Sequence, residues 1–171
     1  MSVYEHLIER HMQPESYTSF VDERERVASF MLYDLSGRLT GFQQYRPDAD
    51  KTKSNHPRES RYFTYATKGK TPVFGMETFD WTNHLFIVEG IFDAVRLHNY
   101  GHSAIALLSN NTKSLRNWLW MLNRPIFAVC DGGETGKHLI KFSHKAFACD
   151  GESDLGDMSE KEVQEIIAFF C

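Results

Sequence analysis

Two acidic residues stand where short apolar runs end, and they are the residues of this sequence best suited to chemistry. Glu89 follows the apolar run 85–88, Asp131 follows the apolar run 126–130, and each is followed by glycine. Short continuous apolar runs are typical of buried parallel strands, and in open α/β sheets the chemistry collects at the carboxyl ends of such strands. Two carboxylates at neighbouring strand ends can hold a divalent cation between them.

The segment after Asp131, with the sequence Asp-Gly-Gly-Glu-Thr-Gly-Lys, allows several interpretations. It can hold a hard cation through oxygen ligands or a phosphate through backbone N–H groups. It is not a Walker A loop, because His138 follows Lys137 where Ser or Thr is required, and it does not contain the dinucleotide-binding glycine pattern. The alternative is a tight strand-to-helix turn in which the glycines serve only to relieve steric crowding and bind no ligand.

Asp93 and the loop with Asp154 and Asp157 can each be explained without a role in binding or catalysis. Asp93 falls on the first turn of the helix expected after Glu89, where it complements the helix dipole. Asp154 and Asp157 lie in one loop before a helix capped by Ser159, and alone that loop is best explained as an acidic surface loop. The acidic loops converge at one edge of the sheet only if the strand order allows it.

The second half of the chain alternates strand-like and helix-like segments, which predicts a parallel sheet with right-handed crossovers. The expected strands are 84–88, 103–108, 125–130 and 146–149. The expected helices are 92–100, 112–122, 135–142 and a last helix from residue 159.

The first half has a different pattern. A short helix is expected at 2–11, with Ser2 as N-cap and Glu5 in the capping-box position, followed by a β-hairpin at 26–42. A polar basic loop at 47–61 leads into a short aromatic strand. We therefore expect a small α+β subdomain at 1–80 and an α/β domain at 81–171.

Charge is unevenly distributed along the chain, and this distribution bears on whether the protein binds nucleic acid. The net charge of −4 argues against a strong nonspecific nucleic-acid binder. The first half nevertheless contains eight basic residues in a short span against three acids. These basic residues are Arg38, Arg46, Lys51, Lys53, Arg58, Arg61, Lys68 and Lys70.

Other features suggest a cytoplasmic protein. The apolar runs are too short to cross a bilayer, and the first residues lack a signal-peptide pattern. The three cysteines are widely spaced and the eight histidines are scattered, so the sequence predicts no zinc site. His98 and His102, four residues apart, are expected at a helix end and turn and not as a ligand pair.

From His84 to Phe170 the chain resembles the Toprim domain, the catalytic fold of bacterial-type DnaG primases, topoisomerases and related nucleases. The resemblance rests on Val88-Glu89-Gly90-Ile91-Phe92-Asp93-Ala94 and on the strand that ends in Asp131-Gly132-Gly133. The segment Asp154-Leu155-Gly156-Asp157 is similar to the acidic element that follows in primases. This resemblance implies an α/β Rossmann-like parallel sheet flanked by helices.

The first half resembles primases within that family. The segments 37–46, 59–64 and 68–76 are similar to the primase runs that precede the Toprim fold. The resemblance implies a primase core without accessory zinc-binding and helicase-binding domains, of a size that a bacteriophage encodes. Its implied partners are single-stranded DNA and NTPs, with a helicase or another replication protein, and no membrane.

The resemblance also implies roles for individual residues. Glu89 would be a general acid/base or a metal ligand, Asp131 would bind Mg²⁺ (or Mn²⁺), and the eight basic residues would contact nucleic acid or nucleotide. The family has a second aspartate two residues after the first, and here that position is Gly133. Replacement ligands would come from Glu134, Asp154 or Asp157.

Two functions therefore stay open. The first, slightly favoured, is a small primase-like enzyme that performs metal-dependent phosphoryl transfer. The second is a catalytically degenerate Toprim protein that binds DNA or another protein. A nuclease of the same fold ranks third.

Overall fold

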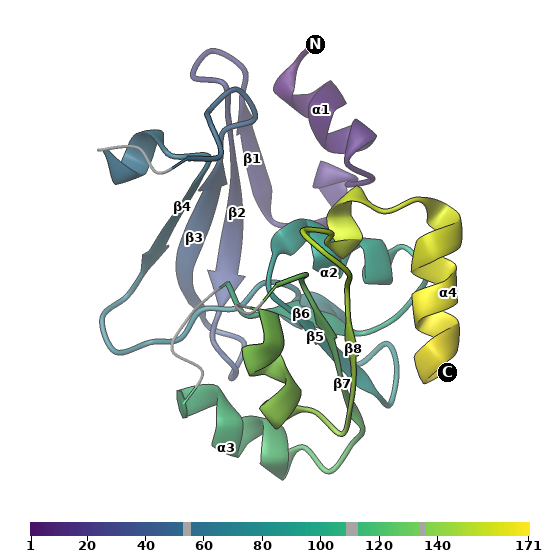
Figure 1. Ribbon diagram of the computed structural model, residues 1–171. Helices are drawn as coiled ribbons and strands as arrows, with labels where there is room; N and C mark the ends of the chain where they lie inside the picture. Colours follow the sequence, from purple (N-terminus) through teal and green to yellow (C-terminus); the bar gives the residue numbers. More distant parts are fainter. Residues whose placement is uncertain (53–55, 109–112, 134–135) are drawn as a thin grey trace. The chain divides into compact units, whose positions relative to one another are not determined.

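The computed structural model describes residues 1–52, 56–108, 113–133 and 136–171. The chain divides into two compact units, Met1–Pro72 and Val73–Cys171. Each unit contains a four-stranded sheet, and the strands of both sheets are labelled in Figure 1. The domain boundary expected at residue 80 stays a prediction.

The first unit contains an antiparallel sheet in the order β1-β2-β3-β4. Its strands are β1 (Ser19–Asp22), β2 (Val27–Tyr33), β3 (Leu39–Tyr45) and β4 (Tyr62–Ala66). The hairpin β2–β3 and the aromatic strand β4 were expected from the sequence. Strand β1 was not expected, because it is a four-residue edge strand that alternates only between half-buried and exposed side chains.

Helix α1 (Val3–Glu9) has the predicted cap. The backbone N–H of Glu5 donates to Ser2 Oγ at 3.0 Å, and the backbone N–H of Ser2 donates to the Glu5 carboxylate at 2.7 Å. Val3 and Leu7 are fully buried on its inner face. Two short 3₁₀ turns, Pro14–Ser16 and Pro57–Glu59, complete the unit.

The second unit contains a parallel sheet in the order β6-β5-β7-β8. Its strands are β5 (Leu85–Val88), β6 (Ala104–Ala106), β7 (Ile126–Cys130) and β8 (Lys145–Ala148). Every residue of β5 is fully buried, as expected for a central parallel strand. The predicted α/β fold class is confirmed.

The strand order determines the direction of each crossover and the face of the sheet on which its helix lies. The chain moves from β5 outward to β6 through α2 (Ile91–His98), and then returns past β5 to β7 through α3 (Lys113–Met121). Right-handed crossovers in opposite directions place α2 and α3 on opposite faces of the sheet. The direction therefore reverses between β5 and β7, and ligands bind at such switch points in open α/β sheets.

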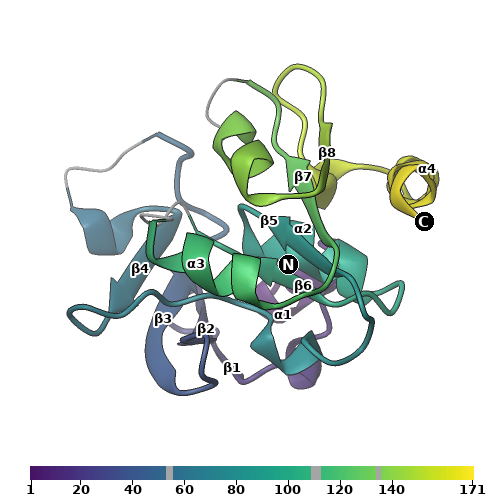
Figure 2. The same cartoon turned by 90° about the horizontal axis from the view of Figure 1, so that it is seen from below.

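Two segments complete this unit. The connection from β7 to β8 contains a 3₁₀ helix, Gly136–Phe142, where the sequence predicted a helical segment at 135–142. A 3₁₀ helix rises more per residue, so a short segment can return the chain along the sheet. Helix α4 (Glu160–Phe170) begins at the predicted Ser159–Glu162 capping box. In Figure 2 the 3₁₀ segment and α4 lie on opposite sides of β8.

Within the described ranges, no helix has the length and apolar character needed to cross a membrane.

Candidate active site

Glu89 and Asp131 meet at the carboxyl edge of the parallel sheet. Each is the first residue after its strand, and β5 pairs directly with β7 through Leu85↔Ile126 and Ile87↔Ala128. Their side chains share a hydrogen bond, which lowers the pKa of Glu89 and raises the pKa of Asp131. The side chain of Glu89 is only 14% exposed. The strand order thus brings the two predicted catalytic residues together.

Crowded negative charge changes the proton affinity of this pair. Burial, the hydrogen bond to Glu89, and the charges of Glu89 and Asp154 raise the pKa of Asp131 to about 8, against a smaller opposing effect of His138. Burial also raises the pKa of Glu89. Two carboxylates this close cannot both ionise at low cost, so they hold one proton between them near neutral pH.

Asp93 is buried and links two of the acidic loops through hydrogen bonds to their backbones. Its carboxylate accepts the backbone N–H of Gly90 at 3.1 Å and the backbone N–H of Gly156 at 2.9 Å. The first bond caps α2, which agrees with the helix-terminus interpretation of this residue. The second bond ties the start of α2 to the loop that contains Asp154. Burial and the charges of Asp131 and Asp154 raise the pKa of Asp93 well above its usual range.

The loop with Asp154 and Asp157 also reaches the site. Asp154 caps the 3₁₀ turn Leu155–Asp157 by accepting the backbone N–H of Asp157 at 3.1 Å. Its charge raises the pKa of Asp93 and of Asp131, so it lies near both. The side chain of Asp157 is exposed. Glu134, the other predicted replacement ligand, lies outside the described residues.

Positions 132 and 133, directly after Asp131, favour glycine for two different structural reasons. A Cβ atom on Gly132 would lie 1.7 Å from the carbonyl oxygen of Gly151, and the Gly132 N–H donates to the Ser153 carbonyl at 2.9 Å. Gly132 is therefore required for the close approach of two acidic loops. Gly133 has φ +94°, a conformation that favours glycine, and a Cβ there would have open space around it. An aspartate at this position would strain the present turn without a steric clash.

The donor set suits a hard divalent cation held in part by substrate. Glu89, Asp131 and Asp154 offer only carboxylate oxygens, and burial raises the pKa of Glu89 and of Asp131. Over the described ranges, no three carboxylates have ligand oxygens within 4.8 Å of one another. Mg²⁺ is commonly bound by one or two carboxylates, water and substrate phosphates, so the residues present fit such an ion.

Two neighbours of Glu89 were not expected from the sequence. His138, in the 3₁₀ segment after β7, places Nδ1 3.3 Å from Oε1 of Glu89. Leu108, just after β6, donates its backbone N–H to the Glu89 carbonyl at 2.9 Å and has φ +58°. A positive φ in a non-glycine residue is uncommon and clusters at functional sites. Neither residue belongs to a local motif, so no sequence signal marks it.

The predicted nucleic-acid residues fall into two groups in the first unit. Arg38, Lys51, Arg58, Lys68 and Lys70 are exposed, and Lys53 lies outside the described residues. Arg46 and Arg61 are half-buried.

The guanidiniums of these two half-buried arginines bind backbone carbonyls. Arg46 donates to the carbonyls of Arg58 (3.0 Å) and Glu25 (3.1 Å), and Arg61 donates to the carbonyl of Ala49 (2.8 Å). These bonds tie Ala49 and Arg58 to the ends of β3 and β4.

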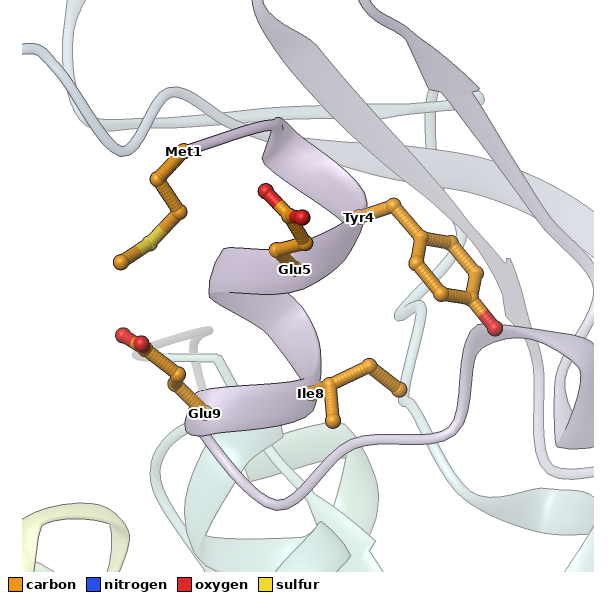
Figure 3. A pocket seen from close by; sticks show the side chains of 5 residues that line it. All are labelled: Met1, Tyr4, Glu5, Ile8 and Glu9. Atoms are coloured by element: carbon orange, nitrogen blue, oxygen red, sulfur yellow. The ribbon is translucent and has the colours of Figure 1, made fainter.

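A separate surface hollow of about 430 Å³ lies along α1. Figure 3 shows its lining side chains, which are Met1, Tyr4, Glu5, Ile8 and Glu9. It contains none of the predicted site residues, and nothing in the structure shows what covers it.

No protein-family model matches the sequence, and no curated protein matches it. Solved structures do share its fold. The Aquifex aeolicus primase (zinc-binding and RNA polymerase domains) is 18% identical with a TM-score of 0.62, over 98% of this chain and 47% of that chain. The E. coli primase catalytic core is 18% identical with a TM-score of 0.60, over 96% and 58%. A DnaG primase catalytic domain bound to single-stranded DNA is 18% identical with a TM-score of 0.63, over 97% and 61%.

This likeness defines the class of fold. The second unit has an α/β fold of the Toprim type, an antiparallel sheet precedes it in the chain, and the solved structures that share this fold are primase domains and catalytic cores. The resemblance seen in the sequence is confirmed at the level of the fold. The chain spans about half the length of the A. aeolicus protein and less than two thirds of the other two.

Proposed function

We propose that this protein is a primase-like nucleotidyltransferase, which joins ribonucleotides on a single-stranded DNA template during DNA replication. The observation that carries the proposal is the Glu89–Asp131 pair, two proton-sharing carboxylates at the switch point of a fold shared with primase catalytic cores. Origin from a bacteriophage and contact with a helicase stay predictions of the sequence.

Glu89 and Asp131, with Asp154 beside them, would hold Mg²⁺ or Mn²⁺. The ion supplies charge neutralisation for the phosphates and for the leaving group. Loading the ion requires loss of the proton that the pair shares, because metal ligands must be deprotonated. The clamp by Asp93 keeps the Asp154 loop next to the pair while the charge changes.

In the chemical step, the 3′-hydroxyl of the growing primer attacks the α-phosphorus of an NTP. A bond from that oxygen to phosphorus forms, the bond to the β-phosphate oxygen breaks, and pyrophosphate leaves. Glu89 is the group suited to accept the hydroxyl proton, since its carboxylate is the hydrogen-bond acceptor of the pair. His138, 3.3 Å away, orients that carboxylate.

The first unit has a surface that suits a single strand. Phe42 on β3 pairs with Tyr65 on β4, and their rings stack with centroids 5.4 Å apart. Phe63 lies on the same face, 6.4 Å from Phe42, with the Arg58 guanidinium 6.0 Å above its ring. Aromatic rings beside exposed basic residues form platforms on which bases stack without sequence preference.

A primer-synthesis assay tests the proposed reaction. The protein is incubated with labelled NTPs, single-stranded DNA and Mn²⁺, and we expect short ribonucleotide products that depend on template. The variants Glu89→Gln and Asp131→Asn should reduce product at least about a hundredfold. Glu77→Gln, which changes an acid outside the site, is the matched control and should keep activity. Product formation that is unchanged in Glu89→Gln would contradict the proposal.

Template binding is tested separately from chemistry. Binding of fluorescent single-stranded DNA should weaken as salt increases. Tyr65→Ala should weaken it by about fivefold to a hundredfold if a base stacks there. Tyr62→Ala, an exposed aromatic on the opposite face of the same strand, is the control. Equal affinity in Tyr65→Ala and wild type would remove this surface from the proposal.

One observation favours a second function. Gly133 occupies the position of the family's second aspartate, and its φ of +94° is suited to glycine. A degenerate Toprim protein would bind DNA or a replication protein without chemistry. Normal template binding together with no product and no Mg²⁺ or Mn²⁺ binding at millimolar concentration would establish this alternative.

A further inference from the structure

Three potential metal ligands from distant parts of the chain meet at the amino edge of the parallel sheet. His84 directly precedes β5, His102 precedes β6, and Cys171 follows α4. One ligand atom from each lies within 4.8 Å of the other two. Nε2 of His84 and Nδ1 of His102 are 2.8 Å apart.

Aromatic packing holds these side chains in place. The His84 ring stacks on Phe127 at 5.3 Å and meets the edge of Phe86 at 5.4 Å. The His102 ring meets Phe86 at 5.5 Å. Phe170 stacks on Phe127 at 5.0 Å, and this contact places the next residue, Cys171, beside the histidines. The cluster is therefore built by the packing of α4 on the sheet.

We propose that His84, His102 and Cys171 form a zinc-binding site, with a fourth position filled by water or another small ligand. Two imidazoles and a thiolate are borderline-to-soft ligands that suit Zn²⁺ and not Mg²⁺. Zinc sites with three protein ligands and one open position are well known. In the described part of the chain, this is the one group of three such ligands that converges.

The short distance between the two ring nitrogens is that of a hydrogen bond between neutral imidazoles, in which one ring donates and the other accepts. Tetrahedral Zn²⁺ requires nitrogens about 3.3 Å apart, given Zn–N distances of about 2.0–2.1 Å. Binding therefore requires a small rotation of the rings and a change of tautomer, and it releases the proton of the Cys171 thiol.

The site is distinct from the candidate active site. Glu89 follows the carboxyl end of β5, and His84 precedes the amino end of the same strand. Zinc here would fasten the end of α4 to two strands, so its expected role is to stabilise the second unit. It would hold the face of the sheet on which Phe86 and Phe170 meet at 5.2 Å.

Cobalt substitution tests this site without reference to activity. The protein is stripped with a chelator and titrated with Co²⁺, then with Zn²⁺. We expect a thiolate-to-cobalt charge-transfer band with tetrahedral d–d absorption, displaced by Zn²⁺ and not by excess Mg²⁺. Cys171→Ser should abolish the charge-transfer band, and His84→Asn or His102→Asn should weaken affinity at least about tenfold.

Matched controls keep this test decisive. Cys149→Ser changes a buried free cysteine at another place in the unit and should keep the band. Cys171 is exposed, so Cys171→Ser should fold normally by circular dichroism even where a histidine variant does not. Zn²⁺ should raise the thermal midpoint of wild type and not of Cys171→Ser. A missing band in wild type, or a band that persists in Cys171→Ser, would overturn the proposal.

Discussion

Nδ1 of His138 lies 3.3 Å from Oε1 of Glu89, and this contact joins the end of β5 to the segment after β7. His138 thus places a ring nitrogen beside a pair of carboxylates that share one proton. A positive charge there lowers the pKa of Asp131, whereas Glu89 and Asp154 raise it. The balance of these neighbours sets the pH at which the site can accept a cation.

Replacing His138 should move that pH upward. In His138→Gln the opposing charge is lost, so the pKa of Asp131 rises and metal binding needs a higher pH. We expect the pH at half-maximal Mn²⁺ binding to increase by roughly half a unit to one unit. Calorimetry at several pH values measures it, with His56→Gln, an exposed histidine of the first unit, as control. An unchanged pH dependence would show that His138 does not act on the pair.

The raised pKa of Asp131 makes the metal-free protein less stable as pH rises. The folded state binds the proton more tightly than the unfolded chain, so this contribution is complete below pH 3.8 and is lost as pH rises to about 8. Asp131→Asn removes the titrating group. Urea unfolding in chelator should therefore show Asp131→Asn gaining stability relative to wild type from about pH 5 to pH 8.

The comparison with Asp131→Asn is necessary because other groups titrate in the same window. Glu89 and Asp93 have raised pKa values and act in the same direction, whereas His84 and His102 have lowered pKa values and act in the opposite direction. The difference between the two proteins cancels the histidines and isolates the acidic cluster that Asp131 forms with Glu89 and Asp93. A difference that is constant with pH would contradict the shared-proton interpretation.

Comparing Gly133→Asp with Gly133→Asn separates the effect of an added negative charge on metal binding from the effect of backbone strain at position 133. Gly133→Asp and Gly133→Asn both place a side chain at φ +94°, and both should cost about 1 kcal/mol of stability. Only the aspartate adds a negative ligand beside Asp131. We expect Gly133→Asp to bind Mg²⁺ several-fold more tightly than Gly133→Asn in calorimetry. Equal affinities would show that position 133 does not reach the ion.

The buried Arg96 predicts a stability effect far from the chemistry. Its side chain is 1% exposed, and it forms an ion pair at 3.1 Å with Glu160 at the start of α4, which also accepts the Tyr100 hydroxyl. Nη1 of Arg96 has no hydrogen-bond partner within the described residues. Glu160→Gln should lower the free energy of unfolding by about 1–3 kcal/mol, because it leaves a buried cation poorly compensated.

Glu165 supplies the matched control for that prediction. It pairs with Lys161 at 3.9 Å on the exposed surface of the same helix. Exposed pairs at this spacing contribute little, so Glu165→Gln should leave unfolding by urea essentially unchanged. Equal losses in the two variants would mean that α4 is sensitive to any lost acid, and that the Arg96 pair has no special role.

The local pattern of the sequence was sufficient for most elements. Continuous apolar runs identified the parallel strands, and the Ser2–Glu5 and Ser159–Glu162 pairs identified two helix starts, because capping is decided within a few residues. The edge strand β1 was missed, and the sequence left open which kind of helix forms at Gly136–Phe142. Strand pairing depends on which neighbour lies beside the segment, and local periodicity does not encode that neighbour.

The sequence by itself determined that Glu89 and Asp131 end two buried strands. Only the tertiary structure decided that these strands are neighbours, because the order β6-β5-β7-β8 depends on the direction of each crossover. The same order brings His84 and His102 together, and the packing of α4 on the sheet adds Cys171, although their spacing in the chain predicted no zinc site. Contacts between residues so far apart are fixed by the packing of whole elements, and the local sequence does not encode which elements pack together.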